Sequence, residues 1–226
     1  MLPEDREAIV ATAMNGEALP PDHGAPARLL LPGVVGARNV KWLEKIVVRR
    51  EMGASPWDAS FYKNKAGEAI MHWPVTSSVT HVNGVPTSSL PKREVTVYQD
   101  RDRVRVQGYA FAGGGERVAK VDVSLDDGAT WHAADFTRRE LSADGKRQWT
   151  WTLWEAQLPC GLPDESAMVV CCRATDASGN TQPLTAAEAL EAEPSGYLFN
   201  AVHRVRADVN RIEGLGGTAT CSERVA

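Results

Sequence analysis

The residues best suited to bind an anion lie close together near the start of the sequence. Between His23 and Arg50, the only carboxylate is Glu44, and it is outnumbered by the cations Arg28, Arg38, Lys41, Lys45, Arg49 and Arg50. Glycine-bearing turns interrupt the same segment and would bring backbone N–H groups close to a ligand. Arginine, lysine and backbone donors together suit a buried phosphate or another polyanion. On composition alone the alternatives are a solvated basic strand edge and, for His23, a structural hydrogen bond.

The overall composition is that of an ordinary soluble globular protein. The 226 residues are 43% hydrophobic and 24% charged, which excludes wholesale disorder. A net charge of −4 gives no indication of a nucleic-acid-binding face. The apolar runs are all far shorter than a bilayer span, so we expect no transmembrane helix.

The cysteines show no spacing typical of a metal site or of a disulfide framework. They stand at Cys160, Cys171, Cys172 and Cys221, with no CxxC pair. On a strand, the adjacent Cys171 and Cys172 would point to opposite faces. We therefore predict reduced, mostly buried thiols.

Few regular elements are predicted for the first 93 residues. Pro3, the following acidic residues and Gly16 indicate a helix over residues 3–16. Residues 27–31 read as a short apolar strand, and residues 52–93 read as loops with scattered Pro, Ser and Gly.

Short strands with alternating patterns dominate the rest of the sequence. Polar and apolar residues alternate over 121–125, 149–153 and 204–209, whereas 168–174 is apolar at nearly every position. We predict an antiparallel β-sandwich over residues 94–212, preceded by a first domain at 1–93 and followed by a tail at 213–226. The tryptophans Trp149, Trp151 and Trp154 are expected in its core and interface, and Asp126 and Asp127 in a turn rather than a calcium site.

Two motifs lie near the start of the sequence, DHGAPAR at residues 22–28 and PGVVGARNVKWL at residues 32–43. They resemble the signature of the sulfite oxidase family of molybdenum enzymes, which also contains eukaryotic nitrate reductase. Further stretches resemble the family in the same order, at residues 108–115, 121–131, 180–183 and 200–205. The resemblance implies a mainly β fold: an incomplete α+β molybdopterin-binding domain followed by an immunoglobulin-like antiparallel β-sandwich that mediates dimerisation.

The resemblance also assigns roles to residues. It implies a molybdenum–molybdopterin cofactor whose pterin and phosphate are held by His23, Arg28, Gly36, Ala37, Arg38, Asn39 and Lys41. The family's substrate-site tyrosine falls on Tyr62, whose phenol can donate a hydrogen bond to an oxyanion.

Two departures from the family pattern affect the site. The family's cysteine ligand lies well upstream of the first motif, but no cysteine precedes Cys160, so we assign no metal ligand and expect a fragment or truncated gene model. A haem domain is not encoded in the chain. Where the family commonly has a substrate-binding arginine, the chain has Glu116, followed by Arg117. We predict that a shift of the preceding glycines lets Arg117 contact the anion. The alternative is that Glu116 faces the anion pocket.

The resemblance implies an oxidoreductase of sulfur metabolism that transfers an oxygen atom to sulfite, giving sulfate. We expect a homodimer that passes electrons to cytochrome c or dioxygen, located in the mitochondrial intermembrane space or, alternatively, in a peroxisome or the cytoplasm. Residues 32–38 favour sulfite over nitrate. The chain alone is expected to be inactive, and the open alternatives are a nitrate reductase-type member and a non-catalytic dimerisation module.

Overall fold

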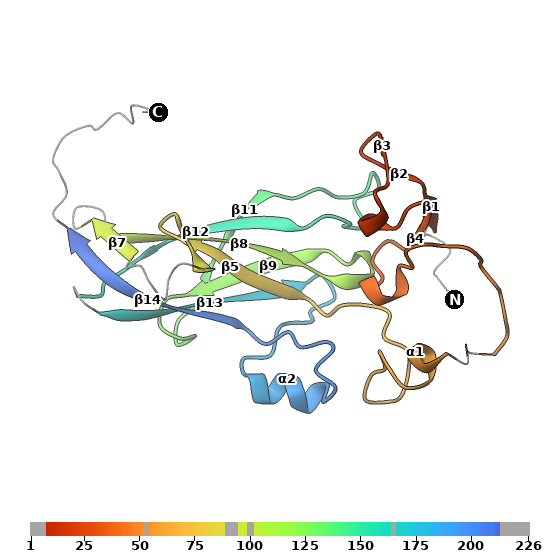
Figure 1. The fold of residues 1–226 in the computed structure, drawn as a ribbon. Coiled ribbons are helices and arrows are strands. Elements are labelled where there is room, and N and C mark those ends of the chain that lie inside the picture. The colour runs from red at the N-terminus through yellow and green to blue at the C-terminus, as the bar shows by residue number, and fades with distance from the viewer. Residues whose placement is uncertain are drawn as a thin grey trace.

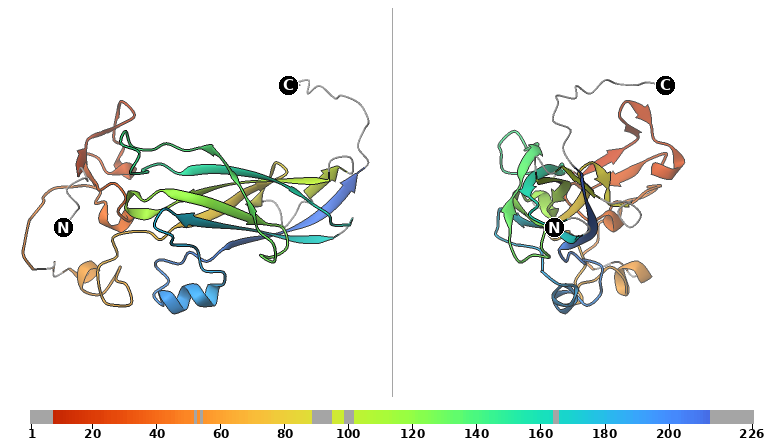
Figure 2. Two further views of the ribbon diagram at one scale, coloured as in Figure 1. Left: turned by 180° about the vertical axis from the view of Figure 1, so that it is seen from behind. Right: turned by 90° about the vertical axis from the view of Figure 1, so that its left-hand side faces the viewer.

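Two five-stranded β-sheets pack face to face in the computed structural model, which describes residues 8–51, 53, 55–88, 95–98, 102–163 and 166–212 (Figures 1 and 2). The first sheet has the order β10 (His132–Ala133), β9 (Val118–Ser124), β13 (Ala167–Asp176), β14 (His203–Ile212) and β7 (Val95–Tyr98). The second has the order β11 (Asp135–Arg138), β12 (Thr152–Pro159), β8 (Arg103–Phe111), β5 (Thr76–Val82) and β6 (Val85–Pro86). Neighbouring strands are antiparallel except β14 and β7, which pair in parallel. The predicted mainly β fold with an antiparallel sandwich is confirmed.

The core lies between the two sheets and follows the alternation of the long strands. Its fully buried side chains include Val82, Val104, Val106, Val121, Val123, Trp154, Met168 and Val170. The Trp154 ring requires a glycine opposite it, because a Cβ on Gly108 would overlap the ring. The indole N–H of Trp154 donates to the Ser77 hydroxyl at 3.0 Å, which satisfies its one polar atom in the core.

The strands predicted at 121–125, 168–174 and 204–209 are present as β9, β13 and β14. β13 lies between β9 and β14 in its sheet, and both of its faces carry buried residues, Val170 and Cys172 in the core and Cys171 on the other face, as its continuous apolar sequence indicates. Cys172 packs into the core, whereas Cys171 faces the other side and lies 3.7 Å from an Asp127 carboxylate oxygen. Burial raises the pKa of both thiols to about 12. Cys160 is also free and buried, and Cys221 lies outside the described residues.

The strand predicted over 149–153 begins later and faces the other way. β12 starts at Thr152, which is fully buried, whereas Trp151 is 56% exposed and Leu153 is 41% exposed. The Trp151 ring stacks instead on the outward-facing Tyr109, with 4.5 Å between ring centroids. Of the three tryptophans expected in the core and interface, only Trp154 is in the core, and Trp149 is 42% exposed.

The helix predicted over residues 3–16 is wrong for the part that the structure describes. Short strands replace it: β1 (Ile9–Ala11), β2 (Ala13–Met14) and β3 (Glu17–Ala18). β2 and β3 form a hairpin whose two turn residues, Asn15 and Gly16, have φ of 53° and 85°. Asn-Gly is the preferred pair for such a turn, so this sequence signal outweighs the helical spacing. β1 pairs with β4 (Arg28–Leu30), which confirms the strand expected at 27–31.

The loop character expected for residues 52–93 fails at 76–86, where β5 and β6 lie. β5 precedes the domain boundary predicted at residue 94, yet it pairs with β8 inside the second sheet. β5 could not be recognised from hydrophobic alternation, because one of its inward-facing residues is polar. Ser77 is 1% exposed and donates to the Tyr109 carbonyl at 2.9 Å. Elsewhere in the segment a single turn, α1 (Pro56–Ala59), is helical.

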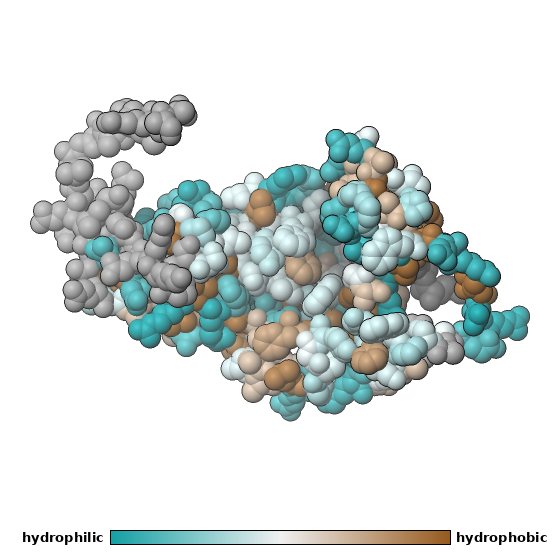
Figure 3. Space-filling model, in the orientation of Figure 1, coloured by the Kyte–Doolittle hydropathy of each residue, from teal (hydrophilic) through white to brown (hydrophobic). Residues whose placement is uncertain are grey.

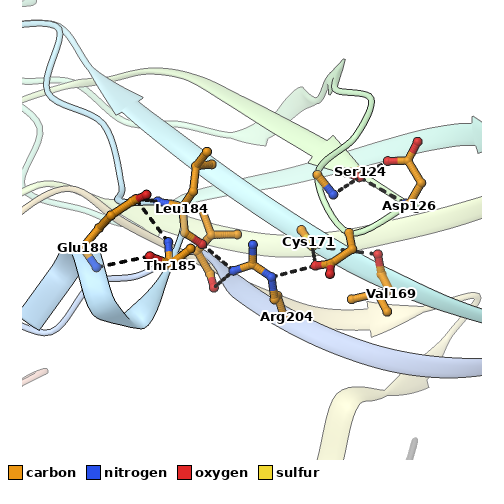
Figure 4. Close-up of polar contacts among 11 residues, drawn as sticks. Ser124, Asp126, Val169, Cys171, Leu184, Thr185, Glu188 and Arg204 are labelled. Atoms are coloured by element: carbon orange, nitrogen blue, oxygen red, sulfur yellow. Dashed lines mark hydrogen bonds and ion pairs between the residues drawn. The ribbon is translucent and has the colours of Figure 1, made fainter.

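A second helix, α2 (Ala186–Ala192), was not predicted from the sequence. It begins with a capping box in which the Thr185 hydroxyl accepts from the Glu188 N–H and the Glu188 carboxylate accepts from the Thr185 N–H (Figure 4). Arg204 of β14 ties this start to the sandwich, since it donates to the Leu184 carbonyl at 2.6 Å and to Asp127 at 2.7 Å. Hydrophobic surface is visible over α2 in Figure 3. Among the described helices, none is long and apolar enough to cross a membrane.

Candidate functional site

Three of the predicted cofactor-binding residues come together around one short turn. The 3₁₀ turn η1 (Pro21–His23) accepts a side-chain hydrogen bond at each of its three backbone carbonyls. Arg28 donates to the His23 carbonyl at 3.0 Å, and Lys41 donates to the Asp22 carbonyl at 2.7 Å. The Trp42 indole N–H reaches the same turn and donates to the Pro21 carbonyl at 2.9 Å. His23, Arg28 and Lys41 therefore form one basic cluster, which we call the basic turn.

A strand-like pairing places Arg28 and Lys41 side by side. The Leu29 N–H donates to the Val40 carbonyl at 2.8 Å, and the Leu43 N–H donates to the Ala27 carbonyl at 2.8 Å. Gly24 closes the turn behind the two cations with φ of 110°. A Cβ at Gly24 would lie 3.0 Å from the Lys41 Cβ and 3.1 Å from the Arg28 Cβ, so this tight contact and the positive φ both favour glycine.

The basic turn fits a phosphate group. The Nε atom of Arg28 is buried and has no hydrogen-bond partner in the described structure, a state that disfavours folding unless an acceptor binds there. Lys41 and His23 are exposed to solvent. The described residues hold no cluster of three or more His, Cys, Asp or Glu that could bind a metal ion. The donor set thus suits a phosphate group such as that of a molybdopterin.

The predicted residues 36–39 form a second structural unit. Gly36 and Ala37 are exposed on the 3₁₀ turn η2 (Gly36–Arg38). The Asn39 amide stabilises the loop before this turn, since its oxygen accepts from the Leu31 N–H at 2.6 Å and its nitrogen donates to the Val35 carbonyl at 3.0 Å. The position of Asn39 is thereby fixed by the fold itself.

Arg38 links this turn to the predicted substrate tyrosine. Its guanidinium donates to the Tyr62 carbonyl at 3.1 Å and to the Ile70 carbonyl at 3.3 Å. The Ile70 N–H also donates to the Tyr62 carbonyl at 2.9 Å. Tyr62 has φ of 53°, a conformation that a side-chain-bearing residue adopts only where its surroundings hold it.

The structure brings Ala37, Arg38 and Tyr62 to one cavity of about 470 Å³. Its other described lining residues are Val40, Ser55 and Trp57. A guanidinium and a phenol in an open, partly apolar cavity can bind a small oxyanion. The ring centroid of Trp57 lies 6.2 Å from that of Tyr62, a proximity that no spacing in the sequence indicates.

The triple-glycine turn lies against the basic segment but does not bring Arg117 to this cavity. In the turn η4 (Gly113–Gly115), the Gly114 N–H donates to the Gly33 carbonyl at 2.8 Å. The Glu116 carboxylate faces away, since it accepts from the Ser178 hydroxyl at 3.3 Å. Neither Glu116 nor Arg117 is among the described residues that line the cavity, so the contact of Arg117 with an anion stays a prediction.

Known proteins match both parts of the chain. Residues 68–210 match the sequence model of the Mo-co oxidoreductase dimerisation domain, and residues 1–57 match that of the oxidoreductase molybdopterin binding domain. Human mitochondrial sulfite oxidase is 36% identical over 209 residues, which cover 91% of this chain and 37% of that protein. The chain belongs to the sulfite oxidase family of molybdenum-cofactor oxidoreductases. The resemblance stated from the two motifs is therefore confirmed.

Other members of the family show the same relation. The NADPH nitrate reductase of Phytophthora infestans is 35% identical over 194 residues, covering 78% of this chain and 21% of that protein. Among solved structures, the sulfane dehydrogenase SoxCD from Paracoccus pantotrophus superposes with a TM-score of 0.68 at 25% identity, covering 88% of this chain and 48% of that one. The chain thus spans little more than a third of the length of the sulfite oxidase that it matches. The match of residues 1–57, which contain the basic turn, supports a molybdenum cofactor.

Proposed function

We propose that this chain supplies part of a sulfite-oxidising site and the pairing domain of a sulfite oxidase-type enzyme. The overall reaction converts sulfite and water into sulfate, two protons and two electrons. Sulfite gains one oxygen atom, and the electrons pass to cytochrome c or dioxygen. The observation that carries the proposal is the cavity shared by Ala37, Arg38 and Tyr62, on the same segment as the basic turn. The sulfite oxidase relative, which aligns over 91% of the chain, supports it.

The chain's own residues would bind and orient, and the cofactor would supply the redox chemistry. Molybdopterin, when bound, holds a molybdenum ion that exchanges oxygen and electrons with a substrate. His23, Arg28 and Lys41 would hold its phosphate by charge-assisted hydrogen bonds. Arg38 fixes the Tyr62 backbone, so that the Tyr62 hydroxyl can donate a hydrogen bond to an oxyanion without adding charge to the site.

The proposal extends to assembly and location. We propose that two copies pair through the sandwich that matches the dimerisation domain, with the two-fold symmetry most common in homodimers. The mitochondrial name of the human relative supports a mitochondrion as the place of action. Within it, we propose the intermembrane space.

The direct test uses the reading frame that contains this chain together with any coding sequence upstream. The protein is produced in a host that makes molybdopterin and is given sulfite or nitrate. Sulfite-dependent reduction of cytochrome c, or uptake of dioxygen, is the expected result. Nitrate reduction without sulfite oxidation would identify a nitrate reductase-type member, and a dimer without either activity would support a non-catalytic module.

A further inference from the structure

The side chain of Tyr62 is packed by a residue for which no role has been assigned. The Tyr197 ring lies with its centroid 5.1 Å from that of Tyr62, at an interplanar angle of 36°. This is the geometry of a favourable tilted aromatic pair. Tyr197 lies in the segment that follows α2. A residue 135 positions further along the chain therefore packs against the candidate substrate tyrosine.

A second contact fixes the same two segments to each other. The Lys65 N–H donates to the Glu193 carboxylate at 3.0 Å, and the Lys65 ammonium donates to the Glu191 carbonyl at 3.3 Å. The loop that carries Tyr62 is therefore attached to the end of α2, a helix whose start is tied to the sandwich by Arg204. Figures 1 and 2 show α1 and α2 projecting from the same side of the sheets.

We propose that Tyr197 is a positioning residue that holds the Tyr62 ring at the cavity and thereby sets how tightly the cavity captures a small oxyanion. A tyrosine without such a neighbour can rotate about χ1 and must be immobilised when a ligand binds. Packing against Tyr197 removes that freedom before binding. The inference rests on the proposed function in that it takes Tyr62 to face the oxyanion.

The experiment measures the Tyr62 side chain and oxyanion binding without turnover. The full chain is labelled with 3-fluorotyrosine, and its tyrosine resonances, four by sequence, are assigned by Tyr→Phe substitutions. Sulfate is titrated against chloride at constant ionic strength. We expect the Tyr62 resonance of the wild type to move with sulfate, and Tyr197→Ala to shift that resonance in the absence of sulfate and to raise the sulfate Kd roughly three- to tenfold.

Two variants separate packing from other effects. Tyr197→Phe keeps the ring and should match the wild type in Kd, whereas loss of affinity equal to that of Tyr197→Ala would overturn a packing role. Phe199→Ala removes another exposed aromatic side chain of the same segment and should leave the Tyr62 resonance unchanged. Circular dichroism checks that each variant is folded.

The outcomes distinguish this inference from the proposed function. An unmoved Tyr62 resonance and an unchanged Kd in Tyr197→Ala, or a wild-type resonance that ignores sulfate, would overturn the inference even if the cofactor-loaded protein oxidises sulfite. Tyr197-dependent sulfate binding in a protein that, once loaded with cofactor, fails to oxidise sulfite would support the inference and contradict the proposed function.

Discussion

Arg28 and Lys41 reach the same three-residue turn from segments on either side of a loop, and each uses only part of its hydrogen-bonding capacity there. One terminal nitrogen of Arg28 donates to the His23 carbonyl, whereas its buried Nε has no hydrogen-bond partner among the described residues. Lys41 donates to the Asp22 carbonyl from an exposed position. The fold thus holds two cations in place with donors still available for an anion.

This arrangement predicts that Arg28→Ala and Lys41→Ala lower cofactor retention more than they change turnover per bound molybdenum. Each removes a charge-assisted contact worth about 1.5–3 kcal/mol. Molybdenum content per chain, measured beside sulfite turnover in the cofactor-loaded protein, checks the prediction. Lys45→Ala, an exposed cation on the same segment, is the matched control. If turnover per bound molybdenum fell as far as retention, Arg28 and Lys41 would belong to the substrate site.

At the scale of elements, the sequence predicted strands correctly where the inward-facing residues are apolar. β9, β13 and β14 follow this pattern, so their positions could be read from alternation. β5 was not predicted from the sequence, and the start of β12 was misplaced, because polar side chains face inward there. The Ser77 hydroxyl accepts from the Trp154 indole N–H, and the Thr152 hydroxyl accepts from the buried Gln148 at 2.5 Å. Such pairing depends on residues far away in the sequence.

The candidate site, too, has a part that could be predicted from the sequence and a part that could not. The basic turn could be predicted because its residues are close in sequence and the family motif names them. The contact of Arg38 with Tyr62, and those of Trp57 and Tyr197, depend on how loops meet in three dimensions. No spacing in the sequence encodes them.

The turn after β9 gives an element-level prediction about pH. The Asp126 carboxylate accepts from the Ser124 hydroxyl, from the Thr130 hydroxyl and from the Thr130 N–H, which lowers its pKa from 3.8 to about 2 (Figure 4 shows Ser124 and Asp126). Because the pKa of Asp126 is lower in the folded chain than in the unfolded chain, its carboxylate stabilises the fold when the pH is above the unfolded pKa. This stabilisation is lost as the pH falls from 3.8 toward 2.

Urea unfolding between neutral pH and pH 2 measures this effect. Asp126→Asn should be less stable than the wild type at neutral pH, and the difference should shrink as the pH falls through that range. Thr130→Val, which removes the Thr130 hydroxyl donor, should act in the same direction with a smaller amplitude. A difference between wild type and Asp126→Asn that stays constant with pH would contradict the assigned pKa.

At the scale of the whole molecule, the sandwich is the scaffold on which the site segments rest. The Gly33 carbonyl accepts from Gly114, and the Trp73 carbonyl accepts from Gly113, so the cofactor segment and the loop before β5 both contact the triple-glycine turn. A Cβ at Gly115 would lie 2.5 Å from the Trp149 ring, which shows why this junction is built from glycines. The pairing domain therefore also contributes to the geometry of the site.

The match to a dimerisation domain predicts that the full chain is a dimer. Sedimentation velocity at micromolar concentrations should give a species of twice the 24.5 kDa chain mass. A species that stays monomeric as the concentration is raised would contradict pairing through the sandwich.

Oxygen-atom transfer to sulfite is the function that we propose for the site of which this chain forms part. Sulfate formed in a single anaerobic turnover tests it most directly, with the protein from the complete reading frame loaded with cofactor and mixed with excess sulfite without an electron acceptor. We predict sulfate in an amount equal to the bound molybdenum, and much less from Tyr62→Phe within the same short time. If molybdenum-loaded protein forms no sulfate under these conditions, the site does not oxidise sulfite.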